Sequence, residues 1–346
     1  MDGYAVQSAE TATASKQPVL LAVVGQALPG QPFTGVVQTG QAVRIMTGAP
    51  VPEGADAVVP AELADESDGR VSVRQAVAAG RHIGRRGEDI AEGSTILQAG
   101  RRLRPQDVGV LASIGASPVA VIRRPTVAIL ATGDELLPCG SRPAVYHIVD
   151  SNSVMLAALV HRDGGVRDCQ RLIPDQPEAI EAAFRDSASD VILVTGGSSV
   201  GTEDHAPRIL AEIGELAVHG VALRPAGPAG IGFLDRRPVF LLPGNPVSCL
   251  CAYDLFAGPA VRRLGGRSME LPYRSEVMLL AELIRSAVGR CDYVRVRVQQ
   301  GQVKPVTGGG ASILSSTTRA DGFILVPPEA AELQAGAAVR VYYYDV

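Results

Sequence analysis

The chain of 346 residues contains no tryptophan, and aromatic residues make up only 4% of it. Stacking of aromatic rings on bases is therefore not expected as its main way of binding. The net charge is −4, so no overall basic field attracts nucleic acid. No apolar run reaches the roughly 18 residues that a membrane-spanning helix needs, and no charged leader precedes an apolar stretch. We expect neither nucleic acid nor a membrane among its partners.

The five cysteines, at positions 139, 169, 249, 251 and 291, include no Cys-x-x-Cys pair. That spacing fits neither a zinc site nor a disulfide framework, and it predicts reduced thiols in a cytoplasmic protein. The content of 46% hydrophobic and 20% charged residues is that of an ordinary soluble protein. The length predicts two or three domains.

Four segments of different character follow one another. Residues 1–80 hold short β-type runs broken by Pro and Gly, which predict a small β domain. Residues 81–122 are rich in Arg and end in an expected helix over 105–115. Residues 123–265 alternate strand and helix patterns, as an α/β domain does. Residues 266–346 return to alternating strands, which predict a small β-barrel or sandwich.

The predicted fold class is α/β plus β. A central three-layer α/β/α domain with a mostly parallel sheet is flanked by the small N-terminal β domain and the barrel-like C-terminal domain. The central strands read as continuous apolar runs, because strands of a parallel sheet bury both faces. Helices of this domain are expected over 153–162, 177–187, 205–213 and 247–264.

Three predicted strands run directly into loops of Gly, Pro and small hydroxyl residues, over 126–136, 190–201 and 239–248. In an open parallel sheet such loops meet in one crevice at the carboxyl edge, where ligands bind. Backbone N–H groups of Gly-rich turns, together with the helix N-termini that follow, suit phosphate or another oxyanion. We therefore predict a site for an anionic ligand in the middle of the chain.

The loop over 195–201 carries the strongest signal. Its paired glycines allow a ligand close to the backbone, and Thr195, Ser198 and Ser199 add hydroxyl donors. The alternative is a tight turn that needs Gly for positive φ. The loop over 243–248 is stiffened by two prolines, which suits a preorganised surface but is also ordinary at a helix start.

Three acidic residues, Asp134, Glu135 and Asp204, follow the first two of these strands. Carboxylates beside a phosphate site repel the phosphate unless a cation lies between them. Mg²⁺ accepts one or two carboxylates together with water and phosphate oxygens, so a metal explains why acids and anion-binding loops occur together. For Asp204 the alternative is a helix N-cap.

Arginines form a second charged feature. Each offers a fork for phosphate or carboxylate, although a solvated or interface-pairing face explains each one equally well, and Glu88 and Asp89 can neutralise part of the charge. A further Arg, Arg224, follows another expected strand. The clustered residues are Arg81, His82, Arg85, Arg86, Arg101, Arg102 and Arg104.

No covalent nucleophile is predicted. The five histidines are scattered, no Gly-x-Ser-x-Gly elbow follows a strand, and no Walker-type loop is present. The chemistry expected from these residues is positioning and electrostatic stabilisation.

These residues resemble the molybdopterin molybdenumtransferases of molybdenum-cofactor biosynthesis, also called MoeA. Seven landmarks occur in order along nearly the whole chain. They are Met1-Asp-Gly-Tyr-Ala-Val6, Arg44-Ile-Met-Thr-Gly-Ala-Pro50, Arg85-Arg-Gly-Glu-Asp-Ile90, Thr132-Gly-Asp-Glu-Leu136, Asp150-Ser-Asn152, the Thr195-Gly-Gly loop with Asp204, and Leu242-Pro-Gly-Asn-Pro-Val-Ser248.

The resemblance implies a transferase that takes adenylylated molybdopterin and molybdate with Mg²⁺, cleaves the pyrophosphate, releases AMP and leaves molybdenum on the dithiolene sulfurs. It implies a cytoplasmic, elongated homodimer whose site lies between the α/β domain of one subunit and the small β domain of the other. Molybdopterin adenylyltransferase and acceptor molybdoenzymes are further expected partners.

The resemblance also assigns residues. Catalytic positions fall on Asp2, Thr47, Asp89, Glu135, Asp175 and Asp204, of which the first three come from the partner's side, and the metal falls on Glu135 and Asp204. The pterin- and phosphate-binding positions are Thr132, Gly133, Asp134, Ser151, Asn152, Thr195, Gly196, Gly197, Ser198, Ser199, Gly201, Arg224, Pro225, Pro228, Pro243, Gly244, Asn245, Pro246 and Ser248.

Two departures from the family pattern shape the expectations. The family has a further, largely helical segment before Met-Asp-Gly-Tyr-Ala. The resemblance therefore implies that residues 81–122 are the remnant of a helical or linker dimerisation domain, part of which is expected to be missing unless the start codon is misplaced. Where many members read Lys-Pro-Gly-Lys-Pro, this chain has Arg224-Pro-Ala-Gly-Pro228, and Gly227 replaces one lysine. Two alternatives follow: a non-catalytic molybdopterin carrier, or a molybdopterin adenylyltransferase-like activity.

Overall fold

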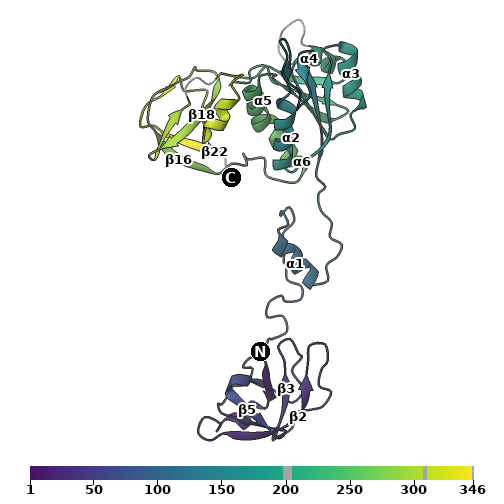
Figure 1. The fold of residues 1–346 in the computed structure, drawn as a ribbon, viewed down its shortest axis with the longest axis vertical. Coiled ribbons are helices and arrows are strands. Elements are labelled where there is room, and N and C mark those ends of the chain that lie inside the picture. Colours follow the sequence, from purple (N-terminus) through teal and green to yellow (C-terminus); the bar gives the residue numbers. More distant parts are fainter. Residues whose placement is uncertain (198–204, 307–309, 345–346) are drawn as a thin grey trace. The chain divides into compact units, whose positions relative to one another are not determined.

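The structure is a computed structural model that describes residues 1–197, 205–306 and 310–344. The chain forms two compact units, Met1–Gln98 and Ala99–Val346, and each is described by itself. Figure 1 colours the first unit purple to blue and the second blue-green to yellow.

The first unit is built on a six-stranded sheet with the strand order β4-β1-β3-β2-β6-β5. Strand β1 pairs with β4 on one side and β3 on the other, and it is buried along its whole length. Small aliphatic residues fill two apolar clusters, which contain Val6 and Val43. The elements are β1 (Gly3–Val6), η1 (Ser8–Thr11), β2 (Val19–Ala27), β3 (Gln41–Ile45), β4 (Ala57–Pro60), η2 (Ala61–Leu63), β5 (Ala64–Ser67) and β6 (Arg70–Val73).

The second unit begins with helix α1 (Pro105–Ser113) and continues into an α/β domain. Its sheet has the order β10-β7-β11-β15-β14-β12; the first four strands are parallel, β14 pairs antiparallel with β15, and β12 pairs antiparallel with β14. The strands are β7 (Thr126–Thr132), β10 (Val166–Ile173), β11 (Val191–Thr195), β12 (Glu215–His219), β14 (Gly230–Leu234) and β15 (Arg237–Leu242), and a separate pair is formed by β8 (Leu136–Leu137) and β9 (Ile148–Val149).

Helices cover both faces of this sheet, which gives three layers (Figure 1). Alternate residues of β7 and β11 face opposite sides, so Ile129 packs with one helix layer and Leu130 with the other. One layer holds α2 (Asn152–Arg162), α5 (Pro246–Ala252) and α6 (Gly258–Leu264); the other holds α3 (Pro177–Asp186) and α4 (His205–Ile213).

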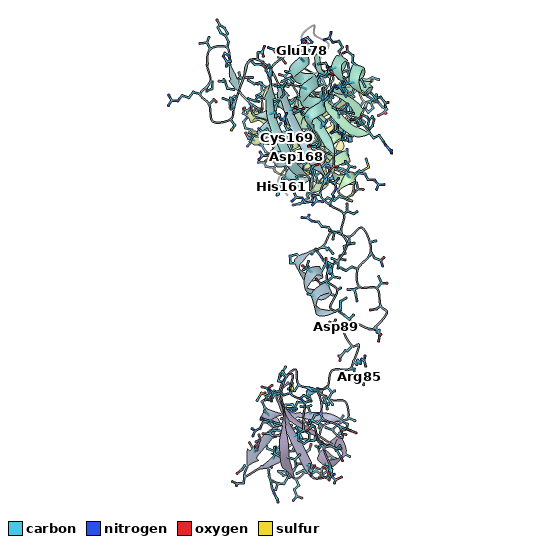
Figure 2. All side chains as sticks on the ribbon, turned by 90° about the vertical axis from the view of Figure 1, so that its right-hand side faces the viewer. Arg85, Asp89, His161, Asp168, Cys169 and Glu178 are labelled. Carbon is cyan, nitrogen blue, oxygen red and sulfur yellow. The ribbon has the colours of Figure 1, made fainter. Side chains whose placement is uncertain are left out.

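Two details of the α/β domain differ from the expectation. The central strands β7, β11 and β15 are buried on both faces, but β10 is largely exposed, because it lies at the edge of the sheet. Asp168 and Cys169 of this edge strand are labelled in Figure 2. The helix expected over 247–264 contains a π-helical turn, η3 (Tyr253–Ala257), between α5 and α6.

The C-terminal domain closes into a five-stranded barrel. Its strands pair in the cycle β18-β19-β16-β22-β20, and β20 returns to β18. Strand β13 of the α/β domain adds to β18 in parallel. The elements are β13 (Leu223–Arg224), β16 (Ser275–Leu280), β17 (Ile284–Arg285), β18 (Cys291–Gln299), β19 (Gln302–Pro305), α7 (Ser315–Arg319), β20 (Gly322–Val326), β21 (Glu332–Leu333) and β22 (Ala338–Tyr343).

A shared core joins the barrel to the α/β domain. Tyr293 and Phe323 of the barrel stack with ring centroids 4.0 Å apart and belong to the same apolar cluster as Tyr253 of the π-turn. Beside this cluster, Arg162 on α2 donates a hydrogen bond of 2.9 Å to the fully buried carboxylate of Asp254. The hydroxyl of Tyr273, on the segment that leads to the barrel, donates to the same carboxylate over 2.9 Å.

Candidate functional site

The carboxyl ends of β7, β11 and β15 lie next to one another. In the parallel registers Thr195 pairs with Ala131 on one side and with Leu242 on the other. The amide of Gly196 donates to the Leu242 carbonyl over 3.3 Å. A Cβ on Gly196 would clash with the Thr132 carbonyl oxygen, so glycine is required for this approach. The predicted meeting of the three loops therefore holds for their described residues.

Asn152, the first residue of α2, ties two of these loops together. Its side-chain amide donates to the Thr195 hydroxyl over 2.9 Å and to the Gly244 carbonyl over 2.8 Å. The residue is 9% exposed, and its Oδ1 atom has no hydrogen-bond partner among the described residues. An unpaired buried acceptor beside Gly-rich loops is the kind of group that a bound ligand satisfies.

Acidic side chains gather around the loop after β7. The amide of Asp175 donates to the Asp134 carboxylate over 3.1 Å. Burial, and after it the charges of Glu135 and Asp134, raises the pKa of Asp175 above its ordinary value. The Glu135 carboxylate folds back over Gly133, whose φ is +151° and where a Cβ would lie 2.6 Å from Glu135 Oε2. Both Asp134 and Glu135 are exposed to solvent.

This acidic group fits a metal that keeps most of its coordination for water and ligand oxygens. Among the described residues no three His, Cys, Asp or Glu side chains form a closed metal cluster. Burial and, after it, the charges of Glu135 and Asp134 raise the pKa of Asp175, and a divalent cation would relieve the repulsion among the three carboxylates. Asp204, the second expected metal ligand, lies outside the described residues, as do Ser198, Ser199 and Gly201.

The third loop is rigid and in contact with the barrel domain. Pro243 is buried, whereas Gly244 and Asn245 are exposed, and Pro246 begins α5. The next residue, Val247, donates its amide hydrogen to the carbonyl of Ala311, a loop residue of the barrel domain, over 3.0 Å. Ser248 is buried in the first turn of the helix. The amides of this loop are thus held between two domains.

Cys249, one turn into α5, lies behind the loops. The Thr195 hydroxyl is 3.7 Å from its sulfur. Burial raises the pKa of Cys249 to about 12, so the thiol is neutral at physiological pH and is not a nucleophile.

Arg224 already has a carboxylate partner. Its guanidinium forms an ion pair with Asp292 on β18, which is 1% exposed and also accepts a hydrogen bond of 3.0 Å from Arg290. The cation that the sequence suggests for an anionic ligand therefore joins β13 to the barrel. The rest of the segment forms a turn between β13 and β14, with Pro225 and Pro228 half-buried.

Ala226 and Gly227 of this turn depart from the family pattern in opposite ways. Ala226 has φ +115°, a conformation that favours glycine, which is the residue at this place in Lys-Pro-Gly-Lys-Pro. Gly227 has an ordinary φ, and a Cβ there would meet its nearest atom, the Leu223 carbonyl oxygen, at 3.7 Å. A side chain at residue 227 is therefore compatible with this backbone.

Three expected catalytic residues belong to the first unit. The Asp2 carboxylate accepts hydrogen bonds of 2.8 Å from both the amide and the hydroxyl of Thr47. These bonds lower the pKa of Asp2. Asp89 is exposed in a segment without regular structure, near Arg85, and both are labelled in Figure 2. Thus Asp2 is held as an oriented carboxylate, while Asp89 has no such support.

Ser151, Arg101 and Arg104 are further residues that the sequence singles out. Ser151 is exposed at the start of α2 and makes no capping hydrogen bond with its side chain. Arg101 and Arg104 both bind the buried Asp107 of α1, at 3.0 and 3.1 Å, so their charge is partly neutralised. The role of Asp107 was not predicted from the sequence, although its place three residues after Arg104, at the start of the helix, is the spacing of a capping box.

Models of known families match this chain in three consecutive parts. They are described as "MoeA N-terminal region (domain I and II)" over residues 1–115, "Probable molybdopterin binding domain" over 128–263 and "MoeA C-terminal region (domain IV)" over 278–344. The molybdopterin molybdenumtransferase 2 of Mycobacterium tuberculosis is 34% identical over 355 residues, which cover 99% of this chain and 87% of the relative. The chain belongs to the MoeA family.

Other MoeA relatives agree. The molybdopterin molybdenumtransferase of Haemophilus influenzae is 31% identical and covers 99% of this chain and 85% of its own length. The crystal structure of the molybdopterin biosynthesis MoeA protein from Pyrococcus horikosii superposes with a TM-score of 0.85 at 30% identity, covering 100% of this chain and 87% of that one. The predicted family, which is one of transferases, and the predicted fold class are thereby confirmed.

Helices long and apolar enough to cross a membrane are absent from the part of the chain that the structure describes.

Proposed function

We propose that this MoeA chain inserts molybdate into adenylylated molybdopterin, with release of AMP and dependence on Mg²⁺. The supporting observation is the joined set of loops at the carboxyl edge of the sheet, where Asn152 links Thr195 to Gly244 beside three carboxylates. The names of the curated relatives as molybdopterin molybdenumtransferases give the substrate class.

The chain's own residues bind and orient the anionic substrate. Gly197 and Gly244 lie in the Gly-rich turns after β11 and β15, and backbone amides of such turns suit phosphate oxygens. The Asn152 carbonyl oxygen and the hydroxyl of Thr195 supply polar groups at the floor of the site. Their positions are fixed before the ligand arrives, so little reorganisation is needed as charge develops on the pyrophosphate.

Glu135, with Asp204, would hold the Mg²⁺ ion, and Asp134 and Asp175 add negative charge around it. A bound Mg²⁺ neutralises pyrophosphate oxygens and so favours cleavage between the phosphates. The carboxylates in turn stay ionised near a divalent cation, because the cation's charge offsets the burial and the neighbouring charges that together raise the pKa of Asp175.

A homodimer completes the proposed site. In this arrangement Asp2, Thr47 and Asp89 of a second subunit face the loops of the first, and the oriented Asp2 carboxylate is the best-prepared group among them. The enzyme works in the cytoplasm, receives its substrate from a molybdopterin adenylyltransferase and passes its product to acceptor molybdoenzymes.

The test is a discontinuous assay with purified protein, adenylylated molybdopterin, molybdate and Mg²⁺. We expect AMP release that requires both molybdate and Mg²⁺, and a product that activates an apo-molybdoenzyme. Tight binding of adenylylated molybdopterin without AMP release above the protein-free blank would contradict the enzymatic proposal.

A non-catalytic molybdopterin carrier is the second candidate. It is favoured by the Arg224–Asp292 ion pair and by Gly227, which together leave the segment 224–228 without a cation free for a ligand. Gly227→Lys separates the two candidates, since the backbone at residue 227 accepts a side chain. A catalytic site that lacks this cation is expected to release AMP faster in the variant, whereas a carrier gains no turnover.

A further inference from the structure

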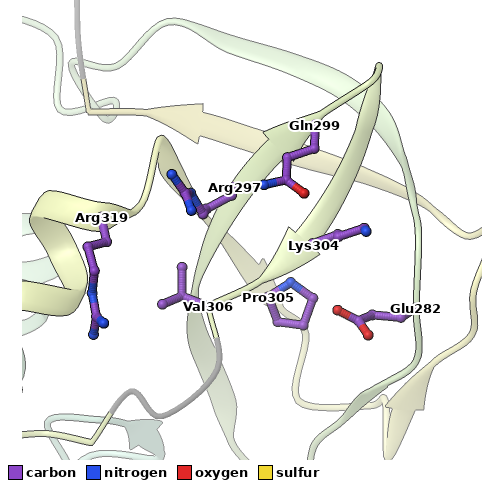
Figure 3. A pocket seen from close by; sticks show the side chains of 7 residues that line it. All are labelled: Glu282, Arg297, Gln299, Lys304, Pro305, Val306 and Arg319. Atoms are coloured by element: carbon purple, nitrogen blue, oxygen red, sulfur yellow. The ribbon is translucent and has the colours of Figure 1, made fainter.

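The barrel domain carries a pocket of about 290 Å³ that plays no part in the loops described above. Figure 3 shows it beside the β18–β19 hairpin, with side chains of that hairpin and of α7 around it. The lining residues are Glu282, Arg297, Gln299, Lys304, Pro305, Val306 and Arg319. Three of the seven are cations and one is a carboxylate.

Two of the cations are directly opposed. Arg297 on β18 and Lys304 on β19 are register partners in the antiparallel pair, so their side chains leave the same face of the hairpin at adjacent positions. Like charges in directly opposite positions destabilise a sheet. Such a pair lowers the stability of the folded state, and binding of an anion explains why both cations are present.

The third cation, Arg319, ends α7 and reaches the pocket from the other side (Figure 3). Its Nε donates to the Ser315 carbonyl over 3.3 Å, which fixes the side chain and leaves the rest of the guanidinium available. Among the described residues, none of these three cations forms an ion pair with a carboxylate, whereas many other arginines of the chain do, as Arg123 and Arg185 illustrate. The pocket therefore keeps an excess of positive charge.

We propose that this pocket binds a small dianion, either a free tetrahedral oxyanion or the terminal phosphate of a phosphate monoester. Arginine forks suit the paired oxygens of such groups, and lysine adds a point charge. The volume is at the small end of ligand pockets, and the lining contains no aromatic ring on which a base or pterin could stack. Charge is thus the main recognition element. The proposal is independent of the proposed function, since none of the loop residues lines this pocket.

The test measures binding of inorganic phosphate, molybdate and AMP to the full-length protein by calorimetry at low ionic strength. The double variant Arg297→Gln/Lys304→Gln removes the opposed pair. Arg340→Gln is the matched control, because Arg340 is an exposed barrel arginine on β22 that does not line the pocket. Loss of a charge-assisted hydrogen bond predicts a fall in affinity of about tenfold or more for each cation removed.

We expect the wild type and Arg340→Gln to show a binding event that weakens in the double variant, while binding of the probes at the proposed substrate loops is the same in all three proteins. Variant-dependent binding of phosphate or molybdate identifies a free oxyanion, and variant-dependent binding of AMP alone identifies a phosphate monoester. Equal affinities of wild type and double variant for all three probes overturn the proposal, even if the double variant loses binding of an acidic polypeptide. AMP release from adenylylated molybdopterin is measured in parallel and is expected to be unchanged, so failure of this site is separable from failure of the proposed function.

Folding is checked by thermal unfolding of the same variants. Because the substituted side chains are exposed and a repulsive pair is removed, the melting temperature of the double variant is expected to be no lower than that of the wild type. Phosphate is expected to raise the melting temperature of the wild type and not that of the double variant. Should the double variant fail to fold, Arg319→Gln provides the same binding comparison on α7.

Discussion

Asn152 donates a hydrogen bond of 2.9 Å to Thr195, and these two residues stand 43 positions apart in the chain. One lies at the start of α2 and the other at the end of β11. A second bond from the same amide reaches Gly244 after β15. A single side chain therefore sets the distance between two loops that the proposed function assigns to substrate binding.

Replacing Asn152 by Ala should loosen this arrangement. Loss of two buried hydrogen bonds is expected to lower the free energy of unfolding by about 1–3 kcal/mol and to weaken binding of adenylylated molybdopterin. Urea unfolding and equilibrium binding check both effects. Asn152→Asp, which keeps the shape but removes the donors, should resemble Asn152→Ala. Ser151→Ala is the control for stability, since the exposed Ser151 side chain makes no capping bond; a loss of stability as large in Ser151→Ala would contradict the account.

The raised pKa of Asp175 predicts a stability effect with a definite sign. A carboxyl with a higher pKa in the folded than in the unfolded state destabilises the fold once the pH rises above the unfolded value, here 3.8. Asp175→Asn should therefore be more stable than the wild type at neutral pH, and the difference should vanish as the pH falls below that value. Chemical denaturation at pH values from about 3 to about 7 measures the difference in the free energy of unfolding between the two proteins. A variant that is less stable than the wild type at neutral pH would show that the folded state stabilises the ionised Asp175 carboxylate, which contradicts the raised pKa.

The buried Asp254 should be costly to remove. Asp254→Ala takes the acceptor from Arg162 and from Tyr273 in an apolar core and is expected to cost about 3–5 kcal/mol. The surface pair of Arg171 and Asp186, 3.5 Å apart, is the comparison, and Asp186→Ala should cost about 1 kcal/mol or less. Guanidinium unfolding of both variants gives the two values. Similar costs would mean that the buried network contributes no more than an exposed pair.

Ala226 offers a test of backbone strain. Its φ of +115° predicts that Ala226→Gly relieves a strain of about 1–3 kcal/mol, which offsets the loss of a buried methyl group worth about 0.8 kcal/mol. The variant is expected to be as stable as the wild type or more so. Ala229, equally buried but without positive φ, is the matched site, and Ala229→Gly should be destabilising. Equal losses at the two positions, measured by thermal unfolding, would show that Ala226 is unstrained.

Much of the α/β domain could be predicted from the sequence. Apolar runs that end in Gly-rich loops identify β7, β11 and β15, and Pro at a helix start with small or apolar residues after it locates α3 closely. The exposed edge strand β10 was less accessible, because its residues lack the apolar run of a central strand. The π-turn within the helix expected over 247–264 could not be predicted, because the sequence shows no clear change of periodicity there.

Long-range polar contacts were beyond prediction from the sequence. The pairing of Arg224 with Asp292 joins residues 68 positions apart, and nothing in the pattern around Arg224 distinguishes a structural ion pair from an anion contact. The cations of the barrel pocket could not be grouped from the sequence either, because it is the strand register that places Lys304 opposite Arg297. Such partners follow from topology and not from local residue type.

The central claim is that the loops after β7, β11 and β15 hold an anionic pterin together with Mg²⁺. The most direct measurement is titration of adenylylated molybdopterin into wild-type protein and into Glu135→Ala, with and without Mg²⁺, alongside thermal unfolding. We predict that Mg²⁺ strengthens binding to the wild type, that Glu135→Ala loses this dependence, and that its melting temperature barely changes because Glu135 is exposed. Mg²⁺-dependent binding that is identical in the two proteins would contradict the claim.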